Sequence, residues 1–261
     1  MKSFLCAVMA LMLTIAGLGC GSASALADDT PGSVFDPANF SATLTLATDY
    51  VFRGISQTDQ NPAVQGSIDY AHPLGIYVGI WGSNVNSNIS AGGVEIDYYA
   101  GYRRELFPNF GFDISAIYYS YPGGGGDPDP DYFEGHLGLS YQFKDLPLSP
   151  NLGAAYFYSP DFFGEDGAGH YVNGSLALSL PYDVTLSGLV GYQNVEGDKT
   201  TGFGQGKNGG DGFDYVNWRI GLAKEVLKFV LDLSWTDTNE SDFLGDDIAG
   251  SHVVFSVSRT F

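Results

Sequence analysis

Apolar and polar residues alternate from Phe40 to Arg53, and this pattern predicts a β-strand with one apolar and one polar face. The alternation restarts after a polar loop, and again after the tight turn His72–Gly75. The apolar row contains Phe40, Ala42, Leu44, Leu46, Tyr50 and Phe52, then Val64, Ile68 and Tyr70, then Ile76, Val78 and Ile80. The chain therefore opens with strand, polar loop, strand, short turn and strand, and the remainder repeats this unit.

Twelve such segments follow one another, each near the ~9–11 residues that a tilted strand needs to cross a bilayer. After the first three they are Gly93–Arg103, Phe110–Tyr121, Tyr132–Phe143, Leu152–Tyr158, Tyr171–Leu180, Val184–Tyr192, Asp214–Ala223, Lys228–Thr236 and Ser251–Phe261. Propensity alone favours a helix at Leu222–Phe229. A turn at Glu225 keeps the alternation in register on both sides, so we predict a hairpin there.

The connections between these segments alternate in length. Short ones follow the even-numbered segments: His72–Gly75, Glu105–Asn109, Lys144–Ser149, Pro181–Asp183 and Lys224–Leu227. Longer, mostly Gly-, Asn- and acid-rich ones follow the odd-numbered segments: Ile55–Pro62, Asn84–Ala91, Pro122–Asp131, Ser159–His170, Asn194–Phe213 and Asp237–Gly250. Short periplasmic turns and long extracellular loops are typical of outer-membrane barrels. An even strand number then places both termini in the periplasm.

Aromatic residues of the apolar row gather at the two ends of the predicted strands. At the loop end they are Tyr50, Phe52, Tyr118, Tyr156, Tyr158, Tyr192, Trp218 and Trp235, and at the turn end Phe40, Tyr70, Tyr102, Phe110, Phe112, Tyr141, Phe143 and Phe229. Two aromatic belts around an aliphatic band match the two interfaces of a membrane. A soluble β-sandwich also alternates, but nothing in it sorts aromatic residues to both strand ends.

The first 27 residues have the features of a secretory signal peptide. Lys2 precedes an apolar run, and the small-residue sequence Ala25–Ala27 forms a cleavage site before Asp28. The alternative of a lipoprotein attached at Cys20 is disfavoured, because Gly17 stands where a large aliphatic residue is needed. Both cysteines, Cys6 and Cys20, lie in this segment, so the mature chain has no disulfide framework.

Charge and hydropathy narrow the class of protein. Beyond the signal segment the chain keeps ten basic and 30 acidic residues, which argues against nucleic acid as a partner. No apolar run long enough for a membrane-spanning helix remains there. The prediction is an all-β protein, a transmembrane antiparallel up-and-down β-barrel of about 12 strands. We expect it in the outer membrane of a Gram-negative bacterium, in contact with the lipid bilayer and lipopolysaccharide.

The expected organisation is a signal peptide at residues 1–27, a flexible periplasmic leader at 28–39 and the barrel at 40–261. The last strand ends the chain on Phe261, with Val253, Phe255 and Val257 on the same face. A terminal aromatic residue on such a strand resembles the signal read by the barrel assembly machinery, which we therefore expect as a partner.

The opening strands also resemble a known family. The matching stretches are Tyr50–Thr58 (YVFRGISQT), Pro62–Gly66 (PAVQG), Gly75–Val85 (GIYVGIWGSNV) and Glu95–Tyr102 (EIDYYAGY). They resemble the TorF family of porin-like proteins, also called the Gcw family. The remaining two thirds of the chain agree with the family in the alternation of apolar and polar residues and in the terminal Phe. The resemblance implies a barrel and a membrane, but it names no solute and transfers no catalytic residue.

The polar row of the strands points into the predicted barrel. Its candidate pore-lining residues are Asp49, Arg53, Asp69, Tyr77, Trp81, Glu95, Asp97, Tyr99, Arg103, Asp113, Glu134, Arg219 and Asp232. Tyr119 and Phe157 share this face. Charges inside a barrel must pair or stay hydrated, so the row implies water, a salt-bridged plug, or both. Arg53 either forms a constriction with Asp49 or another inward carboxylate, or makes an ion pair at the rim.

These features favour a channel for passive diffusion of small polar solutes or cations, because the acidic excess attracts cations. The alternatives are a packed polar interior that only holds the barrel shape and an adhesive barrel without a pore. Whether the leader plugs the pore is left open.

Other motifs carry less weight. Asp127–Asp131 (DPDPD) has the carboxylates of a calcium site but lacks the Gly and terminal Glu of an EF-hand loop, so we interpret it as a solvated loop. Gly123–Gly126 and Gly202–Gly206 open no helix and therefore lack the mechanism of a phosphate loop.

A hydrolytic barrel is the alternative from the enzyme class. His136, Ser140 and Glu134 share a face, yet residues i and i+4 of a strand lie about 13 Å apart, too far for a triad within one strand. We expect no enzyme, no metal and no cofactor.

Overall fold

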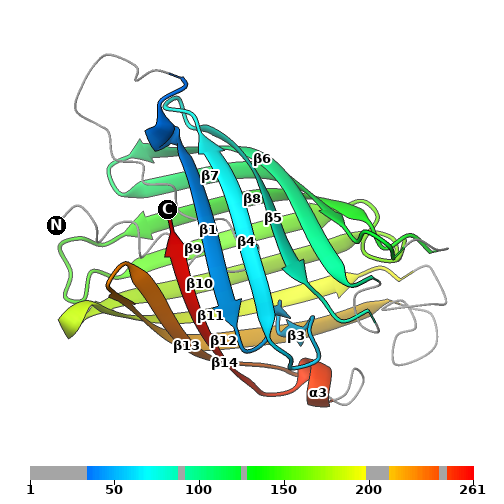
Figure 1. Ribbon diagram of the computed structural model, residues 1–261. Coiled ribbons are helices and arrows are strands. Elements are labelled where there is room, and N and C mark those ends of the chain that lie inside the picture. The colour runs from blue at the N-terminus through cyan, green and yellow to red at the C-terminus, as the bar shows by residue number, and fades with distance from the viewer. Residues whose placement is uncertain (1–33, 88–91, 125–127, 198–211, 241–245) are drawn as a thin grey trace.

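The computed structural model describes residues 34–87, 92–124, 128–197, 212–240 and 246–261. Twelve antiparallel strands form a closed barrel, as the sequence predicts (Figure 1). They are β1 (Phe40–Ala47), β4 (Ala63–Ala71), β5 (Ile76–Asn84), β6 (Val94–Phe107), β7 (Phe110–Ser120), β8 (Tyr132–Gln142), β9 (Asn151–Ser159), β10 (Gly169–Leu180), β11 (Val184–Val195), β12 (Phe213–Val226), β13 (Phe229–Thr238) and β14 (His252–Thr260).

Each strand pairs with its neighbours in sequence, and β1 closes the barrel between β4 and β14. Thr43 lies opposite Ser67 of β4 and Thr260 of β14. Closure satisfies the backbone hydrogen bonds of every wall strand and leaves no free sheet edge, which a strand needs in order to cross a bilayer.

The wall strands have an apolar outer face and a polar inner face. Alternate residues of β1 are exposed, and the same holds for the aliphatic residues of β4, where Ile68 is 68% exposed. Inner-face residues such as Asp97 and Ser234 are buried. This arrangement is the reverse of a soluble protein, in which apolar side chains fill the interior, and it suits a wall in contact with lipid.

Most predicted belt aromatics lie on the outer face, Tyr118, Tyr156 and Trp235 among them. For Tyr50 and Phe52 the prediction is wrong. The wall strand ends at Ala47, and the chain turns into the barrel, where Tyr50 is 7% exposed and packs its ring on Trp81. The predicted strand Phe40–Arg53 is therefore one wall strand followed by part of an inner hairpin.

The inner hairpin consists of β2 (Val51–Phe52) and β3 (Ile55–Ser56), which form a sheet of their own. A short helix, α3 (Asp246–Ala249), packs beside β3 at the same end of the barrel (Figure 1). We call this the loop end, and the opposite end, where β1 begins and β14 stops, the turn end.

The hairpin predicted near Glu225 is present, but its turn lies at Leu227–Lys228. Both residues have positive φ angles of 53° and 68°, which a two-residue turn of type I′ requires. The strand β12 therefore continues through the segment with helical propensity. Pairing of β12 with its neighbouring strands β11 and β13 overrides that local preference.

Two further short helices, η1 (Pro37–Asn39) and η2 (Pro181–Asp183), lie outside the wall strands. The described part of the leader lies outside the barrel, because the carbonyl of Val34 accepts a hydrogen bond of 3.0 Å from the outward Tyr70 hydroxyl. The predicted signal peptide with Cys6 and Cys20, leader residues 28–33, Asp127, Gly125–Gly126 and Gly202–Gly206 lie outside the described residues. Across the described ranges, no helix is long and apolar enough to cross a membrane.

Candidate functional site

The inner hairpin occupies the lumen at the loop end. After Ala47 the chain leaves the wall, and it rejoins the wall at Ala63. Arg53 and Gly54 form the tip, with φ angles of 49° and 84°. Positive φ at both positions is again the signature of a type I′ turn, for which Asn and Gly are the preferred residues. An arginine at the first position is unusual and costs backbone energy.

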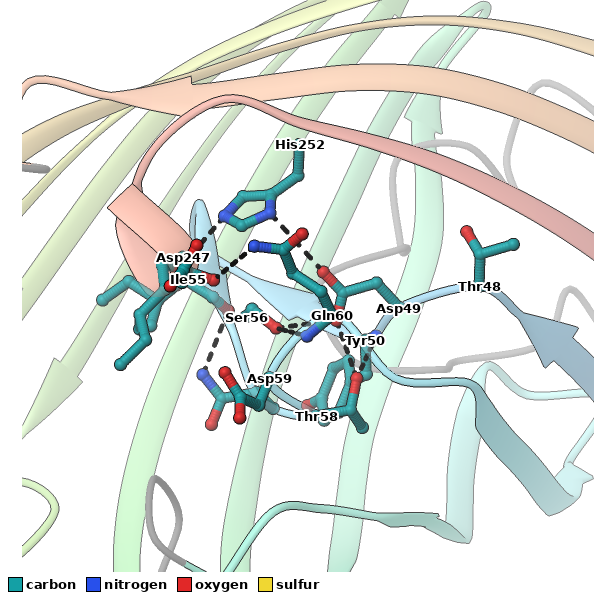
Figure 2. Close-up of polar contacts among 12 residues, drawn as sticks. Thr48, Asp49, Tyr50, Ile55, Ser56, Thr58, Asp59, Gln60, Asp247 and His252 are labelled. Carbon is teal, nitrogen blue, oxygen red and sulfur yellow. Dashed lines mark hydrogen bonds and ion pairs between the residues drawn. The ribbon is translucent and has the colours of Figure 1, made fainter. Parts of the chain in front are cut away.

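Asp49 organises the base of the hairpin. Its Oδ1 accepts hydrogen bonds of 2.7 Å from the hydroxyls of both Ser56 and Thr58, as Figure 2 shows. Its Oδ2 lies 3.8 Å from Nδ1 of His252 on β14. The Ser56 hydroxyl accepts in turn from the backbone amide of Gln60 at 3.0 Å. These contacts cross-link both arms of the hairpin and tie them to the wall.

The tip of the hairpin reaches the opposite side of the barrel. The Arg53 guanidinium donates two hydrogen bonds to Glu134 of β8, at 2.9 and 2.6 Å, and a third of 2.8 Å to the side-chain oxygen of Gln193 on β11. In the strand order, β8 to β11 lie across the ring from β1. The pair with Glu134 is bidentate, and both side chains are 1% exposed. Arg53 therefore spans the lumen.

Aromatic rings enclose the same guanidinium. Its central carbon lies 4.9 Å from the ring centre of Phe157 and 4.3 Å from that of Tyr171, both within cation–π range. Burial alone lowers the pKa of Arg53, but the charge of Glu134 outweighs it and holds the pKa above its ordinary value. Arg53 stays protonated inside the barrel.

Gly54 fits against the wall where no other residue fits. A Cβ at this position would lie 2.5 Å from Cγ2 of Thr238 and 2.8 Å from Cβ of Asn217. Asn217 also accepts a 3.1 Å hydrogen bond from the Tyr171 hydroxyl. The tip is thus packed directly onto β12 and β13, beside the aromatic ring that covers Arg53.

Two further acids lie in this buried half of the lumen. Glu95 is 2% exposed and accepts a 2.9 Å hydrogen bond from the Tyr50 hydroxyl. Burial, and then the charges of Glu95 and Asp97, raise the pKa of Tyr50 well above its ordinary value, so Tyr50 remains a donor. Asp97 is fully buried, and neither of its carboxylate oxygens has a hydrogen-bond partner among the described residues.

Ion pairs in the turn half of the lumen are more exposed. Arg103 contacts Asp113 at 2.7 Å, and the same carboxylate accepts from the Tyr77 hydroxyl. On the other side, Arg219 contacts Asp232 at 2.6 Å. The two arginine side chains are 26% and 21% exposed, so water reaches this half of the barrel. Asp69 accepts from the Tyr99 hydroxyl in the same row of inner residues.

All thirteen predicted pore-lining residues lie inside the barrel. Asp49 and Arg53 are on the inner hairpin and not on the wall. The expected pairing of Arg53 with an inward carboxylate occurs with Glu134, whereas Asp49 serves as the base of the hairpin. Their role in lining a conducting pore is still a prediction.

The hairpin leaves little free space at the loop end. A cavity of about 40 Å³ remains there, lined by Phe52, Arg53, Ile55, Gln57, Tyr121, Tyr132, Phe162, Phe163, Gln193, Val195, Phe213 and Tyr215. This volume admits only a water molecule or two. Among the described residues, the hairpin and the aromatic side chains packed on it therefore occupy the loop end of the lumen.

Sequence reasoning missed Gln193 and Tyr171, which hold Arg53 together with Glu134. Both residues occupy the inner row of their strands, and that alternation was the available signal. The contact itself depends on how the hairpin folds inward, and no residue pattern reports that.

His136 has partners on the neighbouring strand and not on its own. Its Nδ1 lies 3.0 Å from the Ser115 hydroxyl and 3.7 Å from the Asp113 carboxylate. In a catalytic triad the serine and the acid bind opposite ring nitrogens, so this arrangement does not match one. Ser140 is not among these partners.

The Asp131 carboxylate is used to cap the turn after β7, since it accepts from the Ser120 hydroxyl at 2.8 Å and from the Tyr121 amide at 2.7 Å. Over the described ranges, no group of three His, Cys, Asp or Glu side chains is placed to hold a metal ion.

Comparison with known proteins places this barrel among porins in fold. A family model described as "Bacterial protein of unknown function (Gcw_chp)" matches residues 33–261. No curated protein matches the chain. The solved KdgM porin, alone and in complex with disordered oligogalacturonate, superimposes with a TM-score of 0.55 at 9% identity, over 85% of this chain and 99% of that chain. The NanC porin gives a TM-score of 0.53 at 10% identity, over 85% and 98%.

Proposed function

This chain belongs to the Gcw_chp family of bacterial proteins of unknown function, and we propose that it is an outer-membrane porin-like channel for passive diffusion of small polar solutes or cations. The observation that carries the proposal is the contrast between the two faces of the closed barrel. The outer face exposes aliphatic residues, whereas the inner face holds carboxylates and arginines. A lipid-facing wall around a polar lumen is the architecture of a transmembrane channel. The fold shared with the KdgM and NanC porins supports the same function.

The balance of charge in the lumen favours cations or neutral polar solutes. Seven acids (Asp49, Asp69, Glu95, Asp97, Asp113, Glu134 and Asp232) face three arginines (Arg53, Arg103 and Arg219). A low-dielectric wall focuses the field of such an excess along the lumen. Oligogalacturonate, which the KdgM porin binds, is a polyanion that this charge would repel. The solutes proposed for this chain are therefore cationic or neutral, whereas oligogalacturonate is anionic.

The second candidate is a structural or adhesive barrel without a conducting pore. The inner hairpin favours it, because the hairpin fills the loop end in this conformation. The two candidates differ in whether the hairpin moves. A hydrolase is less favoured, since the Ser115 hydroxyl and the Asp113 carboxylate both lie on the same ring nitrogen of His136.

Uptake into liposomes tests the channel. Protein refolded in detergent should show heat-modifiable migration on gels and strand-rich circular dichroism, and it should then be reconstituted into vesicles. We expect lysine and glucose to enter these vesicles faster than glutamate, because the lumen is acidic. Vesicles that contain an equally well folded barrel but admit none of these solutes would favour the structural or adhesive candidate.

The proposed location is the outer membrane, with lipid and lipopolysaccharide around the barrel and the terminal Phe261 as the contact for the assembly machinery. Phe261 is 69% exposed and its backbone pairs with Ala42, which leaves its ring accessible. The signal peptide at residues 1–27 would direct export.

A further inference from the structure

Four wall residues surround the Arg53 guanidinium, each from a different strand: Glu134 of β8, Phe157 of β9, Tyr171 of β10 and Gln193 of β11. We call these four the cage. Their contacts cover the edge of the guanidinium with acceptors and its face with rings. None of the four belongs to the hairpin, so the cage is part of the barrel wall itself.

The chemistry of the cage is that of a binding site for an organic cation. A carboxylate that receives two parallel N–H bonds recognises the planar fork of a guanidinium, and a compact ammonium does not reproduce this geometry. Aromatic rings over the face add cation–π attraction, which is strongest where water is excluded. From this geometry we infer that the cage binds the guanidinium group of a small solute, and that Arg53 occupies it as an internal ligand while the hairpin is docked. This inference rests on the proposed channel function and names the solute class.

Two features of the hairpin separate this inference from a purely structural ion pair. Arg53 sits at a turn position that asparagine or glycine would occupy at lower cost. The base of the hairpin is held by its own contacts around Asp49, which do not involve the tip (Figure 2). The base of the hairpin therefore forms without Arg53, whose guanidinium lies in the cage.

Two further acids lie in the same buried half of the lumen as the cage. Glu95 and Asp97 on β6 are buried, and Asp97 has no hydrogen-bond partner among the described residues. The small cavity at the loop end borders both Arg53 and Gln193.

A variant that keeps the turn but empties the cage tests the inference directly. Arg53→Asn retains a residue suited to positive φ and removes the guanidinium. We expect calorimetric titration of the detergent-folded variant with methylguanidinium to give binding about tenfold or more tighter than for wild type, whose cage is filled. Methylurea, the neutral analogue of the same shape, should bind about tenfold or more weaker than methylguanidinium, because it lacks the charge that Glu134 pairs with. Arg53→Gly serves as a second variant of the same kind.

Two controls separate the cage from any unpaired carboxylate. Arg53→Asn combined with Glu134→Gln should lose the binding. Arg219→Gln frees the Asp232 carboxylate in the same lumen, and within the described residues no aromatic ring lies over Arg219. This variant should bind methylguanidinium no better than wild type. Equal binding of methylurea, undiminished binding after Glu134→Gln, or equal binding by Arg219→Gln would overturn the inference.

Transport by the wild-type protein distinguishes failure of the cage from failure of the channel. Arginine and citrulline differ by the replacement of the guanidinium with a neutral ureido group, so arginine should enter proteoliposomes faster, and Glu134→Gln should bring the two rates together. Equal entry of both by wild type would contradict the cage and leave the channel standing. Binding of methylguanidinium to Arg53→Asn without entry of either amino acid would contradict the channel and leave the cage standing.

Discussion

At the scale of single residues, the closed lumen depends on Arg53 and Gly54. Arg53 supplies three hydrogen bonds to β8 and β11, and Gly54 lets the tip approach β12 and β13 closely. The energy of a buried ion pair is offset in part by desolvation. A steric clash at Gly54 is not offset by desolvation in this way. A substitution at Gly54 therefore tests the contact of the tip with the wall more directly than one at Arg53.

Gly54→Ala should lift the tip from the wall, because the new Cβ would overlap Thr238 and Asn217. Overpacking of this kind costs about 1–3 kcal/mol, so trypsin should cleave after Arg53 about tenfold or more faster than in wild type. Gly164→Ala is the matched control: Gly164 also has a positive φ, of 77°, but a Cβ there meets nothing within 4 Å. If cleavage after Arg53 is equally slow in both variants, the tip is not held by this contact.

At the scale of elements, the hairpin has a base held by its own contacts and a tip that contacts the wall, with Arg53 on β8 and β11 and Gly54 on β12 and β13. Asp49 joins Ser56 and Thr58, and the amide of Asn86 donates to the carbonyl of Gln57 at 2.7 Å. Ser56 is fully buried. Such a base restricts where the tip can go.

Asp49→Ala should loosen the whole hairpin without opening the barrel. The change leaves the Ser56 and Thr58 hydroxyls buried without their acceptor, at a cost of about 1–3 kcal/mol. Hydrogen exchange at the amides of residues 50–58 should become about tenfold or more faster, while the wall strands keep their protection. Asp59→Asn, an exposed change in the same segment, should leave exchange unaltered. Unchanged protection in Asp49→Ala would show that other contacts hold the base.

Most of the barrel was predictable from the sequence because alternation, turn residues and loop lengths all report the same wall. The inner hairpin was not, since its apolar residues Tyr50 and Phe52 continue the period-2 pattern of β1. A strand that leaves the wall alternates just as one that stays in it. The Arg53–Gly54 pair, read as a type I′ turn, was the one local sign of a hairpin here.

The inner face of the wall was predictable in the same way, which is why every candidate pore-lining residue lies inside the barrel. Which of them meet was not predictable. Arg53 and Glu134 are separated by 81 positions, and they meet only because the hairpin crosses the ring. Contacts of this kind depend on the curvature of the closed sheet and leave no mark on local patterning.

At the scale of the whole molecule, the lumen has two unlike halves. The turn half carries ion pairs that water reaches, such as Arg103 with Asp113. The loop half is filled by the hairpin and the aromatic residues around it. A barrel of twelve strands lies between those filled by side chains and those with wide channels. We therefore expect conduction through it to depend on whether the hairpin occupies the loop half.

Planar-bilayer conductance of the wild type and of a variant with residues 50–60 replaced by a short Gly/Ser linker tests the central claim most directly. We predict small currents for the wild type and severalfold larger ones for the shortened protein. In a salt gradient its reversal potential should favour cations, and the preference should shrink when Glu95→Gln and Asp97→Asn are added, because these changes remove two buried carboxyl groups of the lumen. An absence of current from the shortened, correctly folded barrel, or a preference for anions, would contradict the account.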